Sequence, residues 1–289
     1  MNLHHYINSH DFLADLNSNT KHIIISDDNL GPVKRNIQRY TFADLFARKI
    51  DKKEFSDSVI ICIAHSLMAS DMILIDELLP FSHNWISLDP GVMSIYRKSM
   101  PEQNDIITML THHYQVYEPV STTDFLYCIY KEKSYIRMHD ILLAKKLDQK
   151  DSSDTVFISW SQDHSELTIL ANISAIDHVA SAIHTVTQWS SNMFDLFARR
   201  YINKNLSDEL KDSIARTQRI LVVLDHKATE EIWLFLDNLI QQECGNDITI
   251  QYLFPQYHLV SSILPEYILE EAKFDEIAIS DFLWSIIAE

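Results

Sequence analysis

Short apolar runs alternate with longer amphipathic stretches over most of the chain. The runs at 22–26 (HIIIS), 59–63 (VIICI) and 219–224 (RILVVL) are rich in β-branched residues and almost free of polar interruptions. That pattern is typical of strands whose two faces are both buried, as in a parallel sheet. Shorter runs predict further strands at 85–88, 114–117, 134–138, 167–171, 193–197 and 248–253.

Helical spacing of apolar residues fills the intervals between these strands. The clearest case follows 219–224, where Thr229 is the expected N-cap of a helix with apolar positions every three or four residues. Strands that alternate with helices favour an α/β fold, here two α/β/α sandwich domains with mainly parallel sheets. The predicted helices cover 42–50, 67–78, 105–112, 124–130, 174–189, 206–214, the segment after Thr229, and 264–272 as the last.

A polar segment at 145–154 (KKLDQKDSSD) separates two blocks of this kind, and Leu147 is its one large apolar residue. A chain of 289 residues and 33.7 kDa is long enough for two ordinary domains, each with its own core. We therefore expect one domain over 1–149 and a second over 150–289.

Charge and cysteine usage remove several classes of partner and compartment. The chain has 24 Lys and Arg against 41 Asp and Glu, a formal net charge of −17 at pH 7. Such an excess repels phosphate backbones and anionic lipids, so neither nucleic acid nor a membrane is an expected partner. The first residues (MNLHHYINSHDF) lack the basic and apolar parts of a signal peptide. The three scattered cysteines form no disulfide framework, so a cytoplasmic protein is expected.

Glycine is scarce. The chain has 3 glycines, Gly31, Gly91 and Gly245, where average usage would give roughly 20. Because they are isolated from one another, no phosphate-binding loop of the GxGxxG or GxxxxGK type can be written. That excludes dinucleotide enzymes, P-loop ATPases and kinases in their usual forms.

Few polar residues stand where an α/β fold places its chemistry. Asp225 and His226 end the strongest predicted strand, at the edge where such sheets bind ligands. A turn into the next helix also needs polar side chains, so both interpretations of this pair stay open. The histidine pairs His4–His5 and His112–His113 have no third ligand at a suitable spacing, so no metal site is expected. The GxSxG motif of serine hydrolases is absent.

Six segments carry a resemblance to a known family. They are 59–79 (VIICIAHSLMASDMILIDELL), 104–107 (NDII), 114–124 (YQVYEPVSTTD), 135–138 (YIRM), 165–183 (SELTILANISAIDHVASAI) and 216–236 (RTQRILVVLDHKATEEIWLFL). Within the first, Ala69 and Asp71 lie in register with a helix motif F-x-x-R-A-x-D-Q-I. In their order and spacing, the six segments resemble the second half of transketolase-type thiamine diphosphate enzymes, a pyrimidine-binding domain followed by a transketolase C-terminal domain. The same pair forms the β subunit of 2-oxo acid dehydrogenase E1 components.

The resemblance implies that the glutamate which activates thiamine is missing. In the family this residue lies in the first helix of the pyrimidine domain, which the spacing places within 38–47 of this chain. Asp44 is the only acid in that window, and Tyr40 or Thr41 occupies the expected position. A phenol or hydroxyl does not readily replace a carboxyl group that exchanges a proton with a ring nitrogen.

Other parts of the implied cofactor site are also changed. The family's pyrimidine-stacking aromatic residues correspond to Cys62 and His65, of which only His65 could still stack. The substrate-side histidine falls within 99–103 (SMPEQ), which has none. The family's G-D-G motif for magnesium and diphosphate lies on a domain that this sequence does not contain. The resemblance therefore implies no cofactor on this chain alone, and thiamine diphosphate with Mg²⁺ only beside a diphosphate-domain subunit.

Three functions remain open. The first is a degenerate, non-catalytic transketolase-like subunit, which assembles as a homodimer or as a hetero-oligomer with a transketolase-like chain. The second is the C-terminal half of a split thiamine diphosphate enzyme, active in ketol transfer or 2-oxo acid decarboxylation only with its partner. The third is an α/β binding protein unrelated to thiamine. We adopt the first. The candidate catalytic residues are Asp44, Asp225 and His226, and the candidate cofactor-binding residue is His65.

Overall fold

The computed structural model divides into two compact units. The first comprises Met1–Pro90 and Pro101–Asp140, and the second Gly91–Met100 and Ile141–Glu289. The predicted boundary at 149/150 lies outside the residues that the structure describes and stays a prediction. The described residues are 21–25, 37–41, 44, 59–64, 84–87, 115–119, 122–129, 134–137, 155–157, 165–189, 193–199, 205–224, 230–256 and 269–288.

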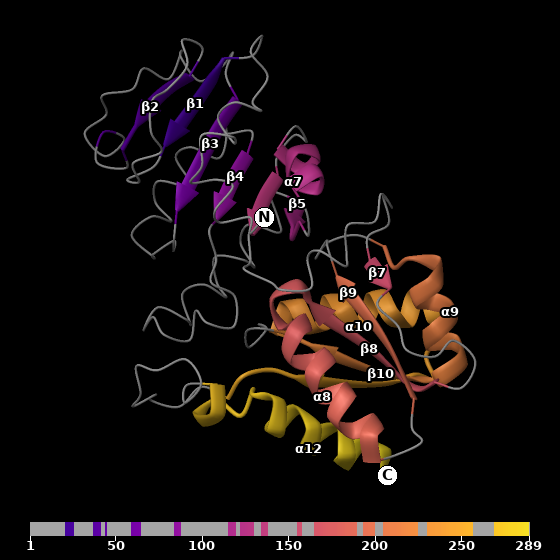
Figure 1. The fold of residues 1–289 in the computed structure, drawn as a ribbon. Helices are drawn as coiled ribbons and strands as arrows, with labels where there is room; N and C mark the ends of the chain where they lie inside the picture. Colours follow the sequence, from indigo (N-terminus) through magenta and orange to yellow (C-terminus); the bar gives the residue numbers. More distant parts are fainter. Residues whose placement is uncertain are drawn as a thin grey trace. The chain divides into compact units, whose positions relative to one another are not determined.

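In its described part, the first unit contains a six-stranded sheet in the order β2-β1-β3-β4-β6-β5, with every neighbouring pair parallel (Figure 1). The β-branched strand β1 lies between β2 and β3 and is buried along its whole length, as is typical of strands in a parallel sheet whose two faces are both covered. The strands are β1 (His22–Ile25), β2 (Ile37–Tyr40), β3 (Val59–Ala64), β4 (Asn84–Ser87), β5 (Gln115–Tyr117) and β6 (Ser134–Arg137).

Helix α7 (Thr122–Ile129) connects β5 to β6 and packs against the sheet. Its inward face buries Phe125, Cys128 and Ile129. The hydroxyl of Ser134, at the start of β6, donates to the carbonyl of Cys128 at 3.0 Å. This bond satisfies a carbonyl of the last helical turn, which has no partner within the helix.

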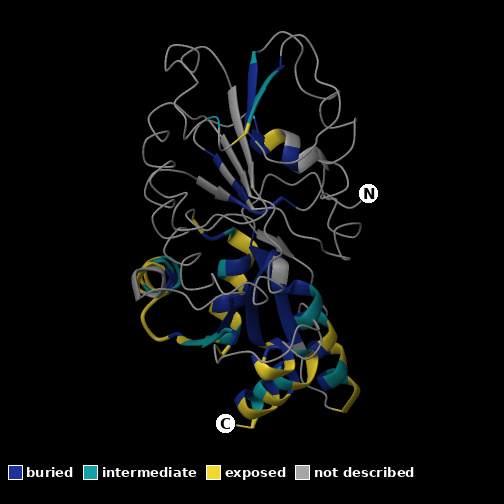
Figure 2. Ribbon diagram, turned by 90° about the vertical axis from the view of Figure 1, so that its left-hand side faces the viewer, coloured by how far each residue is buried: buried dark blue, intermediate teal, exposed yellow. Residues whose placement is uncertain are grey.

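The described residues of the second unit form a five-stranded sheet in the order β11-β10-β8-β9-β7, parallel except for β7 against β9. Figure 2 shows its central strands buried between helices whose outer sides are exposed. The elements are β7 (Thr155–Phe157), β8 (Ser165–Asn172), the 3-10 turn η3 (Ile173–Ala175), α8 (Ile176–Trp189), β9 (Met193–Arg199), α9 (Asp208–Thr217), β10 (Arg219–Val223), α10 (Glu230–Cys244), β11 (Thr249–Leu253) and α12 (Glu276–Ile287).

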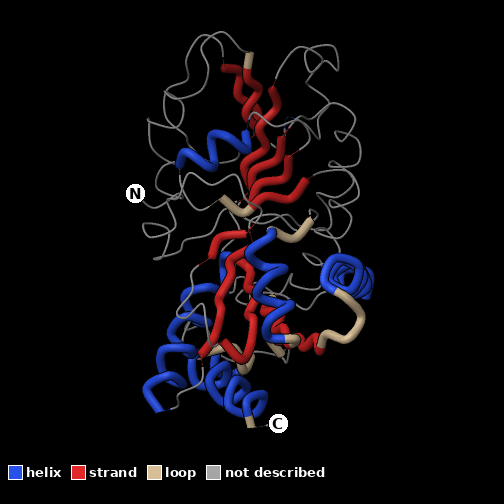
Figure 3. The backbone as a smooth tube through the Cα atoms, turned by 90° about the vertical axis from the view of Figure 1, so that its right-hand side faces the viewer, coloured by secondary structure: helices blue, strands red, loops and turns tan. Residues whose placement is uncertain are grey.

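Two pairs of helices cover opposite faces of this second sheet (Figure 3). Thr168 and Asp195, level with each other on β8 and β9, contact α9. The register of the sheet places the side chain of Tyr252 of β11 on the same face as those of Thr168 and Asp195, and it contacts α10. Arg219 of β10 has the opposite orientation, and its guanidinium donates to the carbonyl of Ile286 in α12 at 2.6 Å. Alternate residues of one strand therefore face α9 with α10, or α8 with α12.

The helices of the second unit begin and end at recognisable caps. Ser207 accepts from the backbone of Leu210 at the start of α9, and Asp275 accepts from Ala278 at the start of α12. Gln218 ends α9 in the left-handed region at φ 55°, and Lys273 adopts φ 52° before α12. Glycine usually takes these positions, so the scarcity of glycine leaves side chains in a conformation that L-residues rarely adopt.

The structure confirms the α/β class and most of the predicted elements. Three elements were not predicted, namely β2, the antiparallel β7 and the last helix α12. The prediction that the chain's last helix covers 264–272 is wrong, because α12 follows it at 276–287. The predicted helices 67–78 and 105–112 lie outside the described residues, and so does the predicted helix 42–50 except for residue 44, which is helical. None of the helices in the described ranges combines the length and apolar character that crossing a membrane requires.

Helix α8 carries a titratable group near the start of α12. His178 is half-buried, and burial lowers its pKa, against the opposite effects of Asp177, Asp275 and Glu276. The unfolded chain therefore takes up a proton more readily than the folded one as the pH falls below the ordinary histidine value of 6.5. The stability that the neutral His178 side chain contributes is therefore fully present above pH 6.5 and is lost as the pH falls below it.

We expect His178→Gln to weaken the dependence of stability on pH. Between about pH 7.5 and about pH 5.5, wild-type protein should lose more of its free energy of unfolding than the variant, as measured by urea unfolding. His184→Gln, at an exposed position on the same helix, is the matched control and should follow wild type. Equal losses in wild type and His178→Gln would contradict this assignment.

Candidate functional site

The first candidate site lies where β2 ends. Tyr40 is the last residue of this edge strand, level with Ile25 of β1, rather than part of a helix. Asp44 is half-buried and helical, one turn beyond the exposed Thr41. The position that the resemblance assigns to the family's glutamate is therefore a junction between a strand and a helix.

Asp44 and Thr41 form a reciprocal cap at this junction. The Asp44 carboxylate accepts from the Thr41 backbone at 3.1 Å and from its hydroxyl at 2.9 Å. In return, the Thr41 hydroxyl accepts from the Asp44 backbone at 3.2 Å. This is the geometry of a capping box, with aspartate in place of the usual glutamate. The one acid of the window thus has a structural role that uses one of its carboxylate oxygens.

If capping is its main role, replacing this carboxylate will destabilise the protein. Asp44→Ala should lower the free energy of unfolding by roughly 1 kcal/mol, as loss of a helix cap does. Asp44→Asn, which retains a side-chain oxygen as acceptor, should lose less. Urea unfolding of the two variants gives the comparison. If Asp44→Ala is instead more stable than wild type, the Asp44 carboxylate destabilises the folded protein, as functional groups often do.

The remaining candidates cannot be placed. His65 is the first residue after β3, and Asp225 and His226 are the second and third residues after β10. All three lie outside the described residues. Cys62 lies within β3, in register with Ile25 of β1. The sequence positions of His65, Asp225 and His226 agree with the rule that α/β sheets carry their sites after the carboxyl ends of strands.

Polar residues lie at the described part of the second sheet's carboxyl edge. Asn172 and Arg199 end β8 and β9 at the same level, and both are buried. The hydroxyl of Tyr252 donates to the Asp237 carboxylate of α10 at 2.6 Å. Burial, reinforced by this bond and by the charge of Asp237, raises the pKa of Tyr252 far above its ordinary value. The phenol therefore stays protonated at neutral pH and cannot act there as a base.

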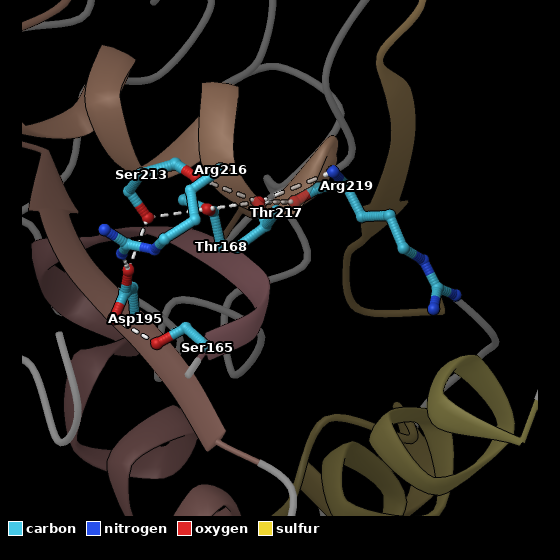
Figure 4. Close-up of polar contacts among 7 residues, drawn as sticks. All are labelled: Ser165, Thr168, Asp195, Ser213, Arg216, Thr217 and Arg219. Atoms are coloured by element: carbon cyan, nitrogen blue, oxygen red, sulfur yellow. Dashed lines mark hydrogen bonds and ion pairs between the residues drawn. The ribbon is translucent and has the colours of Figure 1, made fainter. Parts of the chain in front are cut away.

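A buried carboxylate, which the sequence did not reveal, lies near the opposite edge of this sheet. Asp195 of β9 is fully buried and accepts from the hydroxyls of Ser165 at 2.5 Å and Ser213 at 2.6 Å. Arg216 of α9 makes an ion pair with the same carboxylate (Figure 4). An acid in the middle of an apolar strand (MFDLFAR) was the only signal in the sequence.

The hydrogen bonds continue from Asp195 into the next strand. Ser213 is bonded to Thr168 at 2.7 Å, and Thr168 to Thr217 at 2.8 Å. The Thr217 hydroxyl also donates to the carbonyl of Arg219, the first residue of β10, at 2.9 Å. The network thus joins β8, β9, α9 and β10 near the amino ends of the strands. Ligands of α/β sheets bind at the other edge, so we assign this network to the stability of the second unit.

Neither sheet shows a metal centre in its described part. Among the described residues, no three His, Cys, Asp or Glu side chains come together in a way that could hold a metal ion.

Comparison with known proteins gives a match by structure alone. No family model matches the sequence, and no curated protein matches it. A solved structure of a split-gene transketolase, described as an inactive β4 tetramer, aligns over 92% of this chain and 91% of its own, at 10% identity and a TM-score of 0.68. Transketolase from Campylobacter jejuni aligns over 92% of this chain at 9% identity, with a TM-score of 0.61. A mutant transketolase from Pichia stipitis aligns over 92% at 11% identity, with a TM-score of 0.63.

The lengths that are covered differ between these structures. This chain spans 44% and 43% of the Campylobacter and Pichia chains, but 91% of the split-gene chain. At identities of 9–11% the likeness establishes the fold and not the activity.

Proposed function

We propose that this chain, whose fold is that of transketolases, is a non-catalytic subunit that acts by assembling with itself or with a transketolase-like partner chain. The observation that carries the proposal is the contrast between fold and candidate site. The fold is similar to transketolase over 92% of the chain, yet the position expected for the activating glutamate holds Tyr40 and Thr41.

We infer that this chain does not supply the carboxyl group that activates thiamine diphosphate. Activation of the cofactor needs a carboxyl group that exchanges a proton with its aminopyrimidine ring. The acid of the expected window, Asp44, accepts two hydrogen bonds from Thr41 at the start of a helix. This capping role supports the inference, and we derive no catalytic step through the cofactor.

Assembly is the function that a fold of this kind retains when its chemistry is lost. The split-gene transketolase is an inactive β4 tetramer, so a chain of nearly the same extent forms an oligomer of one subunit type. We transfer that property to this chain as part of the proposal. Since homo-oligomers are usually symmetric and closed, a dimer or a tetramer is the expected state.

The proposal is tested by isolating the tagged chain from its own host and identifying what accompanies it. Native mass spectrometry gives the stoichiometry, and peptide mass spectrometry identifies a second chain. A homo-oligomer, or a complex with a transketolase-like chain, is the expected result. A monomer at all concentrations that binds no transketolase-like chain would overturn the proposal.

The second candidate function is the C-terminal half of a split thiamine diphosphate enzyme. The observation in its favour is extent, because the chain covers 91% of the split-gene chain but less than half of the Campylobacter and Pichia transketolases. The enzyme would then be complete only with a subunit that binds the diphosphate and Mg²⁺. In that case Asp44 would have to serve as the activating acid, and its substitution would abolish turnover of the complex.

A further inference from the structure

Helix α10 presents an exposed stripe without charge. Its exposed residues from 234 onward are Leu234, Phe235, Asn238, Gln241 and Gln242, and the exposed Gly245, Asn246 and Asp247 follow the helix. At 3.6 residues per turn the five helical positions lie on one side, over a length of roughly 12 Å. Leu234 is 54% exposed and Phe235 is 42% exposed, so two neighbouring large apolar side chains face solvent. Figure 3 shows α10 almost along its axis, at the rim of the second unit.

The carboxylates in this part of α10 are turned away from the stripe. Asp237 is half-buried and accepts from the hydroxyl of Tyr252. Glu243 is half-buried, lies 3.3 Å from the ammonium of Lys211 on α9, and accepts from the backbone of Leu206. Both acids therefore connect α10 to its own unit. The uncharged stripe is a consequence of this arrangement in a chain whose net charge is −17.

We infer that the stripe Leu234–Phe235–Asn238–Gln241–Gln242 on α10 is a self-association surface, occupied by α10 of a second copy of this chain. The inference rests on the proposed function and names the surface through which assembly occurs. Two copies of so acidic a chain repel each other wherever their carboxylates meet. Contact is favourable only through a face that brings apolar side chains together and carries no charge, as in the centres of known interfaces.

The amides identify a second copy as the occupant. In a two-fold interface each residue meets the same surface of its partner. An amide both donates and accepts, so Asn238, Gln241 and Gln242 can pair with one another across the two-fold axis, which carboxylates cannot do. A basic partner would instead be expected on an acidic face, since complementary charge steers such complexes.

The other exposed apolar residues of the second unit lie in less suitable surroundings. Trp189 is 80% exposed at the end of α8, but the amide of Gln188 beside it is bonded to the His184 ring at 2.9 Å. On α12, Ile277 is flanked by the exposed acid Glu276, and Asp281 is exposed one turn further on. Within the described residues of the second unit, α10 is thus the helix on which two adjacent, exposed large apolar residues lie beside a row of exposed amides.

The test adds charge to the stripe without changing its shape. Gln241→Glu with Gln242→Glu adds two carboxylates at exposed positions, which places four like charges in the two-fold contact. The matched control, Gln188→Glu with Gln256→Glu, adds the same charge at exposed positions away from the stripe. Sedimentation equilibrium of the purified full-length chain measures the dissociation constant. We expect the α10 variant to weaken association at least 10-fold, and 0.5 M NaCl to recover part of the loss.

Each outcome decides the inference. Selective weakening by the α10 variant supports it, whereas equal weakening in the control, or no change in either protein, overturns it. An oligomer that withstands the α10 variant leaves assembly intact, so only the surface is then wrong. A wild-type chain that is monomeric at all concentrations overturns self-association, and the proposed function then depends on the partner chain alone. Circular dichroism and urea unfolding of both variants exclude misfolding as the cause.

Discussion

Asp195→Ala is expected to lower the free energy of unfolding by about 3–5 kcal/mol, the cost of removing one member of a buried ion pair. The carboxylate is fully buried, and two hydroxyls and the Arg216 guanidinium lose their acceptor with it. Because these donors come from β8 and α9, the loss should affect the whole second unit. Urea unfolding at pH 7, followed by circular dichroism, gives the measurement.

Arg216→Ala is the informative companion to this variant. Removal of the guanidinium leaves a fully buried carboxylate without a counter-charge, although Ser165 and Ser213 still donate to it. The loss should therefore be comparable with that of Asp195→Ala. A double-mutant cycle with both substitutions isolates the coupling between the two charges. A loss of less than about 1 kcal/mol in Asp195→Ala would contradict the structural role of the network.

Phe274→Ala is expected to cost a similar amount, about 3–5 kcal/mol, because it leaves a large cavity in the core. Phe274 is fully buried at the entry to α12, and its backbone donates to the carbonyl of Leu269 at 2.9 Å. In the same turn the backbone of Lys273 donates to the carbonyl of Glu270. The two hydrogen bonds together form a Schellman motif. The backbone of Phe274 thus closes the turn that precedes α12, and its side chain lies in the core.

The control for this second prediction is Trp189→Ala at the end of α8. Trp189 is 80% exposed and lies outside the α10 stripe, so its truncation should change the free energy of unfolding by less than about 0.5 kcal/mol. Denaturation of the two variants under the same conditions compares a buried with an exposed aromatic residue. Similar losses in both would show that α12 is not part of the cooperative core.

The sequence predicted strands best where burial is greatest. Strands β1 and β10 lie inside their sheets, and their apolar runs are continuous because the side chains on both faces are buried. Strand β2 was not predicted because it is an edge strand in which Ile37 alone is buried. Helix α12 was not predicted for a different reason. Its apolar residues Ile277 and Trp284 are exposed, so its sequence lacks a clean amphipathic period.

The candidate site was less predictable than the fold. The spacing Thr41–x–x–Asp44 is a capping signal that the sequence displays directly, yet the resemblance drew attention to Asp44 as an acid. The Asp195 network could not be derived, because its donors are 18 to 30 residues away along the chain and meet only through the packing of α9. His65, Asp225 and His226 remain predictions.

The central claim is that the chain has kept the transketolase fold and contributes assembly rather than thiamine chemistry. It is tested most directly by the ketol-transfer rate of the assembly isolated through the tagged chain, supplied with thiamine diphosphate and Mg²⁺. The account predicts that Asp44→Asn leaves this rate unchanged, whether the rate is zero or is supplied by a partner chain. A turnover that falls at least 100-fold in the Asp44→Asn assembly, at equal recovery of its subunits, would contradict the account and establish the chain as half of an enzyme.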